Sequence, residues 1–321
     1  MLGAALSIGV LLALTGGGAA GTAPQGCTIP PQELARLLER LEGSVATAEL
    51  PNPSVLLALN LAGAAGSNAR QQLLKQLEEE AVKRAQKDMS SGEVALYTLA
   101  LLSSCHSPQQ VEALGLGVDL LRILQQKTDE EVASLDEEGV PLSTLYSVGL
   151  DVLALCVAGT GSYERAAIIL AKQLLSPQSH LSVDTEAVVA LALVCVHGRT
   201  ELDAWEVRDL LEAAVEVVAV SFLYKQTEGN GLIGNVYSTG LAMQLLVAAS
   251  EFYSPWEWDC AQAFSAVGSH NLQQPMAIAQ ALPALVGSSY LDAASLDCST
   301  GAATATSVQL SLSPSTMTAQ E

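Results

Sequence analysis

Two kinds of helical segment alternate along this chain, and that alternation restricts the architecture more than any other feature of the sequence. In the first kind, apolar residues occupy nearly every position, as in residues 94–103, 145–157, 185–196 and 237–250. A helix without a polar face is buried on all sides. The second kind places apolar residues at helical spacing among charges, in residues 71–87, 111–126 and 205–220. We therefore expect buried inner helices to alternate with half-exposed outer helices.

One inner helix and the outer helix that follows it form one unit of a degenerate repeat of roughly 40–50 residues. We expect an all-α chain in which about six helical hairpins form two concentric rings, an α/α toroid. An open superhelix of helical pairs is the alternative arrangement. No segment shows convincing period-two alternation. Aromatic residues make up only 4% of the sequence, so Leu, Ala and Val must fill the core.

The charge balance argues against two classes of partner. The formal net charge is −20, and no stripe of Lys and Arg offsets it. A polyanion such as DNA would be repelled, and anionic membrane surfaces are disfavoured for the same reason. We therefore expect neither nucleic acid nor a membrane surface as a partner.

The first 23 residues have the pattern of an export signal. An apolar run over residues 1–15 is too short to span a bilayer comfortably, and small residues suited to cleavage near Ala20 or Ala23 follow it. No Lys or Arg precedes the run, and an N-terminal membrane anchor is the alternative. No later run qualifies as a transmembrane helix. We expect a signal peptide over 1–23, a helical barrel over 24–298 and a Ser/Thr-rich tail over 299–321, in a secreted product without membrane insertion.

The cysteines agree with export. The six cysteines are spread along the chain without a CxxC pair: Cys27, Cys105, Cys156, Cys195, Cys260 and Cys298. Zinc and redox sites usually need close pairs, so neither is indicated. An even number of dispersed cysteines behind a signal sequence predicts three disulfides, with about fifteen possible pairings. Buried free thiols are the alternative.

A toroid binds its ligand where the N-terminal ends of the inner helices and the adjoining loops converge. Residues 141–146, 177–185, 229–238 and 271–280 precede or begin inner helices and carry polar residues that a plain connection would not need. Asp184 has a simpler interpretation, because the sequence SVDT could place it as a helix N-cap with Glu186 in the first turn.

Four segments resemble a known family. LYSVGLDVLALC, HLSVDTEAVVALALVC, GNVYSTGLAMQLL and QPMAIAQALPALVGSSYLD are similar to segments of the cobalamin (vitamin B12) carriers, the family of transcobalamin, intrinsic factor and haptocorrin. The resemblance extends from about Cys27 to Cys298. It implies an α/α barrel joined to a smaller β domain, with cobalamin held between them. It also implies the disulfides Cys27–Cys260, Cys105–Cys298 and Cys156–Cys195.

The resemblance also implies a set of cobalamin-binding residues, which are Thr144, Tyr146, His180, Asp184, Asn235, Ser238 and Gln280. These side chains offer both donors and acceptors, which the amide groups of a corrin need. His180 stands where a transcobalamin His can bind cobalt as the upper axial ligand, and a neutral imidazole suits cobalt. A solvated loop histidine is the alternative for His180.

Three departures from the family pattern qualify the resemblance. Ser147 stands where the family usually has a larger Gln, and Glu93 stands where transcobalamins have Gln. After Cys298 the sequence resembles the family's interdomain linker and then ends, so we expect the C-terminal β domain to be absent. A divergent single-domain carrier, a splice product and an incomplete gene model are the three explanations.

The expected function is that of a secreted, monomeric cobalamin-binding transport protein recognised by a cell-surface receptor, and not of an enzyme. A glycoside hydrolase on the same toroid is the rival, with Asp151, Asp184 and Glu186 as its possible carboxylates. Sugar sites normally offer aromatic platforms, and the chain has only three Trp. A carrier-derived module that no longer binds cobalamin is the third possibility.

Overall fold

A computed structural model describes residues 27, 29–63, 67–201 and 204–298 of the chain. The expected signal peptide over 1–23 and the expected tail over 299–321 lie outside these described residues. Within them, helices dominate and a single short hairpin supplies the β structure. The prediction of an all-α class is therefore confirmed.

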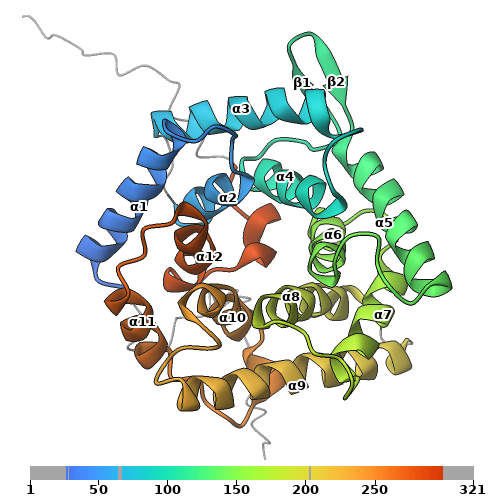
Figure 1. Cartoon of the computed structure of the whole chain (residues 1–321), viewed down its shortest axis with the longest axis vertical. Helices are drawn as coiled ribbons and strands as arrows, with labels where there is room; N and C mark the ends of the chain where they lie inside the picture. Colours follow the sequence, from blue (N-terminus) through green and yellow to red (C-terminus); the bar gives the residue numbers. More distant parts are fainter. Residues whose placement is uncertain (1–26, 28, 64–66, 202–203, 299–321) are drawn as a thin grey trace, which may run out of the picture.

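The inner ring consists of the six helices α2 (Pro53–Leu61), α4 (Ser91–Ser103), α6 (Leu145–Ala158), α8 (Val183–Arg199), α10 (Val236–Ala248) and α12 (Pro275–Leu285). Each inner helix packs against the next one along the chain. The last, α12, packs against the first, α2 (Figure 1). This contact closes the ring, so the structure is the predicted toroid and not an open superhelix.

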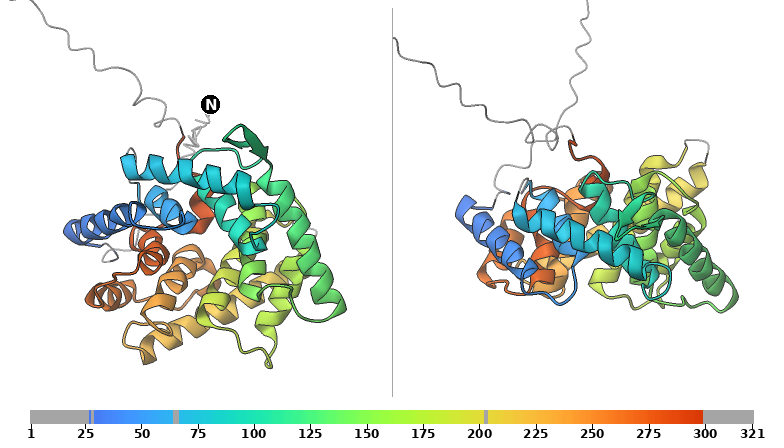
Figure 2. Two further views of the ribbon diagram at one scale, coloured as in Figure 1. Left: turned by 45° about the horizontal axis from the view of Figure 1, so that its top comes forward. Right: turned by 90° about the horizontal axis from the view of Figure 1, so that it is seen from above.

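The outer ring consists of α1 (Pro31–Val45), α3 (Asn68–Arg84), α5 (Leu120–Glu137), α7 (Glu164–Leu175), α9 (Trp205–Glu228) and α11 (Cys260–Ser269). These helices surround the inner ring in Figure 1, and the views in Figure 2 show both rings at the same level. Because every outer helix returns the chain before the next inner helix begins, the inner helices all run in one direction. Their N-terminal ends therefore lie on one face of the barrel.

Local sequence signals set the ends of the inner helices. A capping box starts α4, where the Ser90 side chain accepts from the backbone N–H of Glu93 and the Glu93 carboxylate accepts from the N–H of Ser90. Pro53 stands at the first position of α2, where its missing N–H costs nothing. Gly159 ends α6 with φ +67°, a left-handed conformation that glycine adopts without a side-chain clash.

One predicted helix was wrong at its beginning. Residues 111–126 were expected to be helical throughout, but β1 (Val111–Ala113) and β2 (Leu116–Val118) form an antiparallel hairpin, and α5 begins only at Leu120. Leu114 and Gly115 join the two strands with φ +54° and +74°. Two successive residues with positive φ make the turn that matches the twist of a hairpin. The apolar spacing of this segment did not reveal that turn.

Small residues let neighbouring inner helices approach closely. A Cβ atom added to Gly240 in α10 would lie 2.8 Å from the backbone nitrogen of Ala281 and 2.9 Å from the carbonyl carbon of Gln280, both in α12. A Cβ atom at Gly92 in α4 would lie 2.9 Å from Oγ of Ser147 in α6. Both contacts are shorter than side chains tolerate, so these glycines are required for the observed helix spacing.

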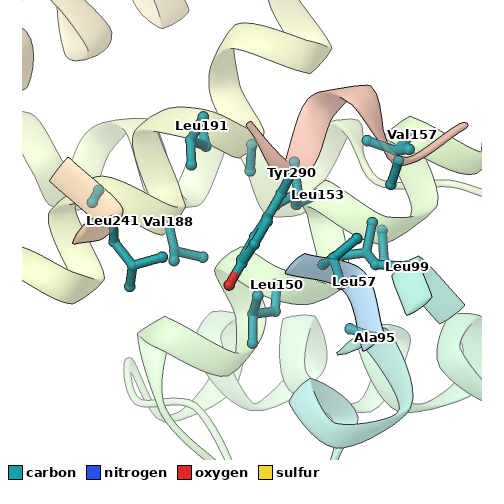
Figure 3. Packing of buried hydrophobic residues seen from close by; sticks show 14 of the residues in the cluster. Leu57, Ala95, Leu99, Leu150, Leu153, Val157, Val188, Leu191, Leu241 and Tyr290 are labelled. Atoms are coloured by element: carbon teal, nitrogen blue, oxygen red, sulfur yellow. The ribbon is translucent and has the colours of Figure 1, made fainter. Parts of the chain in front are cut away.

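A short 3-10 helix, η2 (Tyr290–Ala294), fills the centre of the ring. It follows α12 and packs against α2, α4, α6 and α8. Tyr290 is 1% exposed and lies among apolar side chains of the inner helices (Figure 3). Its hydroxyl lies beside Leu150, and Leu150 precedes Leu153 by one turn of α6. The hydroxyl therefore points toward the N-terminal ends of the inner helices. The bore of the barrel is closed by this residue.

The structure contains the three disulfides that the family resemblance implies. Cys156 in α6 is bonded to Cys195 in α8, with Cα atoms 6.2 Å apart, so this bond joins neighbouring inner helices near their C-terminal ends. The bonds Cys27–Cys260 and Cys105–Cys298 attach the two ends of the described chain to the barrel. Among the described helices, none combines the length and the apolar character needed to cross a membrane.

Candidate functional site

The N-terminal face of the barrel gathers the segments in which site residues were expected. The caps of the inner helices α2, α4, α6, α8, α10 and α12 are Asn52, Ser90, Thr144, Ser182, Asn235 and Gln274. Unpaired N–H groups and helix dipoles give such a face a positive character that favours acceptor atoms of a ligand. We call it the ligand face.

A polar group joins α8 to α10 on the ligand face. The hydroxyl of Ser238 donates to Oδ2 of Asp184 at 3.1 Å. Oδ1 of Asn235 accepts from the backbone N–H groups of Tyr237 and Ser238, at 2.8 and 3.0 Å. That bond occupies the Asn235 oxygen in capping α10 and leaves its amide N–H groups as donors. The structure therefore brings Asp184, Asn235 and Ser238 together.

The simpler interpretation of Asp184 as a helix cap is wrong. Ser182 caps α8, because its hydroxyl accepts from the backbone N–H of Thr185 at 3.2 Å. Asp184 lies in the first turn, where a carboxylate is favoured by the helix dipole, and its side chain reaches α10. The Asp184 carboxylate is thus not needed to start the helix.

Tyr146 and Gln280 stand beside this group. Burial, the larger cause, and the nearby Asp184 carboxylate together raise the pKa of Tyr146 to about 12, and a hydrogen bond with the Gln280 side chain opposes the rise. The Tyr146 hydroxyl therefore keeps its proton at neutral pH and can donate a hydrogen bond. Because the carboxylate of Asp184 and the amide of Gln280 both act on this phenol, the three side chains lie close together.

Beneath these residues is a buried link that sequence reasoning missed. Gln244 in α10 is fully buried; its Nε2 donates to the backbone oxygen of Gln280 at 2.7 Å, and its Oε1 accepts from the backbone N–H of Tyr290 at 3.0 Å. Gln244 thus ties α10 to α12 and to η2. The available signal was a lone amide inside an otherwise apolar helix, because a buried amide needs bonding partners.

Thr144 caps an inner helix on the ligand face, and His180 lies in the loop before α8. The Thr144 hydroxyl caps α6 by accepting from the N–H of Ser147 at 3.1 Å. His180 is exposed in the loop before the Ser182 cap, and in the described part of the chain its ring has no hydrogen-bond partner. The structure does not bring His180 into the bonded group around Asp184.

Exposed apolar side chains lie near the inner-helix caps of the ligand face. Five large apolar residues are exposed within four positions of an inner-helix cap: Leu50, Val140, Leu142, Tyr237 and Met276. We call these residues the apolar collar. A polar centre with an apolar border suits a large ligand that has both polar substituents and an apolar body.

Comparison with known proteins gives the family. A family model described as eukaryotic cobalamin-binding protein matches residues 8–320. This chain belongs to that family. It is 34% identical to cobalamin binding intrinsic factor of Mus musculus over 284 residues, which cover 86% of this chain and 64% of that protein. It is 34% identical to transcobalamin-1 of Homo sapiens over 256 residues, which cover 74% of this chain and 57% of that protein.

A solved structure also shares the fold. The crystal structure of haptocorrin in complex with Cbi matches with a TM-score of 0.70 at 29% identity, covering 86% of this chain and 72% of that chain. The chain spans about 64% of the length of the intrinsic factor that it matches. The family is one of binding proteins, in agreement with the expectation of a binding protein.

The two residues that were expected to depart from the family pattern have structural roles here. Glu93 serves the capping box of α4 and lies 3.6 Å from Arg84, so its carboxylate is engaged locally. Ser147 faces Gly92 at a contact that leaves no room for an added Cβ. A larger side chain at position 147 would have to point elsewhere or separate α4 from α6.

The three carboxylates considered for a glycoside hydrolase stand in three different environments. Asp151 is fully buried in α6, and burial raises its pKa well above the usual range, opposed by Ser91. Glu186 forms an ion pair with Lys225 at 2.7 Å, between α8 and α9. Asp184 is bonded to Ser238. These three groups do not form an acid/base pair in a common cleft, and in the described residues no cluster of three metal-ligating side chains occurs.

Proposed function

We propose that this chain is a cobalamin carrier that holds the corrin against the ligand face of the barrel. The observation that carries the proposal is the polar centre of Asp184, Ser238, Tyr146 and Gln280, bordered by the apolar collar. Family membership and the likeness to haptocorrin in complex with Cbi support it. In this proposal cobalamin, with its cobalt, is the transported ligand.

The chemistry of the polar centre matches the edge of a corrin ring. A carboxylate accepts from amide N–H groups, the protonated Tyr146 hydroxyl donates to amide oxygens, and the Gln280 and Asn235 amides offer N–H donors. Mixed donors and acceptors fix the orientation of a ligand whose body is apolar. In the proposal Thr144 contacts the ligand at the border, through a hydroxyl that also caps α6.

His180 would bind the cobalt ion from the ligand face. Its exposed ring has no competing partner in the described chain, so an imidazole nitrogen is available for coordination. Such a bond forms only with cobalamins whose upper ligand exchanges. Hydroxocobalamin would therefore bind better than cyanocobalamin.

Because Tyr290 closes the bore, the ligand lies across the face of the barrel rather than inside it. The barrel then covers one side of the corrin. A carrier that covers both sides buries more apolar surface and shields its polar contacts better. Residues 24–298 alone would thus bind cobalamin measurably but more weakly than a two-sided carrier, and adding a family β domain would raise the affinity.

We propose further that residues 1–23 direct secretion, that residues 24–298 form a monomeric carrier domain recognised by a cell-surface receptor, and that 299–321 form a linker or tail. The apolar run over residues 1–15 and the family support this assignment. The expected mature product begins near residues 21–24. N-terminal sequencing of secreted protein checks the cleavage, and a product that begins at Met1 would contradict it.

The binding experiment is a titration of the protein with hydroxocobalamin and cyanocobalamin, followed by absorbance and calorimetry. We expect both forms to bind, with the hydroxo form tighter and its corrin spectrum red-shifted. Asp184→Asn should weaken both forms by about 1–3 kcal/mol, because it removes a charged acceptor. His180→Ala should abolish only the difference between the two forms.

Each negative outcome has a separate meaning. Equal binding of both forms by the wild type would remove His180 from the site while leaving the ligand face in place. No binding of either form by a helical, monomeric protein, with or without a family β domain added in trans, would refute the carrier function. As a control, Glu164→Gln at the start of α7 should leave both affinities unchanged, because Glu164 is exposed and lies at the end of the barrel opposite the inner-helix caps.

A further inference from the structure

The outer helix α9 is apolar on two opposite sides. Its inward side packs into the core through Leu211, Ala214, Val215, Val218, Ala219 and Phe222. On the outward side, Ala213, Val217, Val220 and Tyr224 follow one another at intervals of four, three and four residues, which places them in one row. Val217 is 51% exposed and Tyr224 is 63% exposed. An outer helix needs only one apolar side to join the barrel, so the second row is unexplained by the fold.

A tryptophan from another segment extends this row. Trp256 is 48% exposed and comes from the loop that precedes α11. Its backbone N–H donates to the oxygen of Tyr253 at 2.9 Å, which holds the loop at this point. Two hollows of about 650 and 340 Å³ share Val220, Tyr224 and Trp256 in their walls. We call Ala213, Val217, Val220, Tyr224 and Trp256 the α9 stripe.

The fully exposed charged side chains beside the α9 stripe are acidic. The exposed charged side chains of α9 are Glu206, Asp209, Glu212, Glu216 and Glu228. The two basic residues of the helix are partly buried and already bonded, although Lys225 also lines the larger hollow. Arg208 donates to the backbone oxygens of His197 and Thr200 at 3.2 Å, and Lys225 pairs with Glu186 at 2.7 Å. The outward side of α9 therefore presents apolar and aromatic surface with an acidic border.

The negative charge of the acidic border indicates which kind of partner fits the α9 stripe. A second copy of this chain would bring two acidic borders together, and the chain already carries a net charge of −20. Basic side chains opposite the border would instead gain favourable pairs, and an Arg or Lys over Trp256 or Tyr224 would gain a cation–π contact. A row of side chains at helical spacing interdigitates with the similar row of another helix.

We propose that the α9 stripe docks a protein partner through a basic amphipathic helix. The apolar side of that helix packs on Val217, Tyr224 and Trp256, and its Lys and Arg residues face Glu216 and Glu228. The stripe lies on the outside of the outer ring, whereas the ligand face is formed by the caps of the inner helices. Its Tyr224 end lies near the level of those caps, because Lys225 pairs with Glu186 in the first turn of α8. No residue of the stripe is among the proposed cobalamin contacts, so the proposal does not depend on cobalamin binding.

The test uses a synthetic helix of about 18 residues, roughly five turns, with Leu along one side and Lys on the other, labelled with fluorescein. A peptide of the same pattern with Glu in place of Lys is its control. We expect the full chain to bind the Leu/Lys peptide and not the Leu/Glu peptide. Val217→Ser with Tyr224→Ala should weaken binding about tenfold or more, because these exposed residues supply the packed contact.

A matched pair of charge variants separates a specific site from general attraction. Glu216→Lys with Glu228→Lys reverses the acidic border, and Glu137→Lys with Glu138→Lys makes the same change of net charge at the exposed end of α5. The α9 pair should lose binding about tenfold or more, while the α5 pair should keep it within about threefold. All of these positions are exposed, so the helical circular dichroism should be unchanged.

Three results would overturn the proposal. The first is no binding of the Leu/Lys peptide by the wild type. The second is an equal loss of binding in the α9 and α5 charge pairs, which would mean that the peptide senses only net charge. The third is a wild-type dimer in sedimentation analysis that Tyr224→Ala converts to monomer, which would assign the stripe to a second copy of the chain.

Discussion

Gln244 donates a hydrogen bond from its side chain to the backbone oxygen of Gln280, 2.7 Å away across the contact between α10 and α12. Gln280 carries one of the amides of the ligand face, and the other end of the Gln244 amide accepts from the N–H of Tyr290. One buried side chain therefore positions a candidate ligand contact and the residue that closes the bore. No sequence motif pointed to this arrangement.

The first prediction concerns this link. Gln244→Leu removes both hydrogen bonds; it leaves the N–H of Tyr290 buried without a partner and takes from the Gln280 oxygen the bond that it accepts from α10. We expect the free energy of unfolding to fall by about 1–3 kcal/mol, the cost of one orphaned buried group. Urea unfolding measures the change. Gln71→Leu on the exposed side of α3 is the control, and an equally small effect in both variants would contradict the role of Gln244.

The second prediction separates the cap of α8 from the site residue beside it. Ser182→Ala removes the side chain that accepts from the N–H of Thr185 and should lower the free energy of unfolding by about 1 kcal/mol. Asp184→Asn keeps a hydrogen-bond acceptor for Ser238 and should change stability by less than about 0.5 kcal/mol. Its effect should appear in ligand affinity instead. A larger loss of stability in Asp184→Asn than in Ser182→Ala would reverse these assignments.

The third prediction concerns pH and Asp151. Burial raises the pKa of this carboxyl well above its usual range, the Ser91 hydroxyl opposes the rise and Glu131 adds to it. The Ser91 hydroxyl donates to Glu131 at 3.4 Å, and among the described residues neither oxygen of Asp151 has a hydrogen-bond partner of its own. As pH rises, the unfolded chain therefore releases the Asp151 proton at a lower pH than the folded state does.

The sign of the effect follows from proton counting. Between the low pKa of the unfolded chain and the raised pKa of the folded state, the folded state binds more protons, so stability falls as pH rises. Asp151→Asn mimics the neutral acid and should be more stable than the wild type at pH 7.5, with the advantage lost near pH 4. Urea unfolding at both pH values checks this, and Asp88→Asn at an exposed site is the control. An advantage that is independent of pH would refute it.

The fourth prediction concerns the disulfide between neighbouring inner helices. Replacing both Cys156 and Cys195 by Ala should lower the free energy of unfolding by about 2–4 kcal/mol, because the bond closes a loop between residues 39 apart in sequence. Thermal unfolding of the secreted protein measures the loss. Peptide mapping without reduction should recover Cys156 linked to Cys195, and any other partner in native protein would contradict the structure.

Part of the ligand face was predictable because its signals are local. Thr144 and Asn235, which the family resemblance placed in the site, act on backbone groups two or three positions away, so a short stretch of sequence contains the whole interaction. The cap of α8 is Ser182 and not Asp184, two residues later. The part that was missed depends on distant residues. Gln244 and Tyr290 meet across 46 positions in sequence, and their bond exists only after α10, α12 and η2 have packed together.

The sequence by itself determined the alternation of inner and outer helices, because a helix that is apolar all round has no stable position except inside a second layer. It did not determine that the ring closes. Closure depends on the spacing at contacts such as Gly240 with α12, where backbone atoms approach too closely for a Cβ atom. Tertiary structure alone decided that Tyr290 fills the centre and that the Leu114–Gly115 turn replaces a helical start. Both outcomes depend on packing and backbone conformation, which the periodicity of apolar residues does not encode.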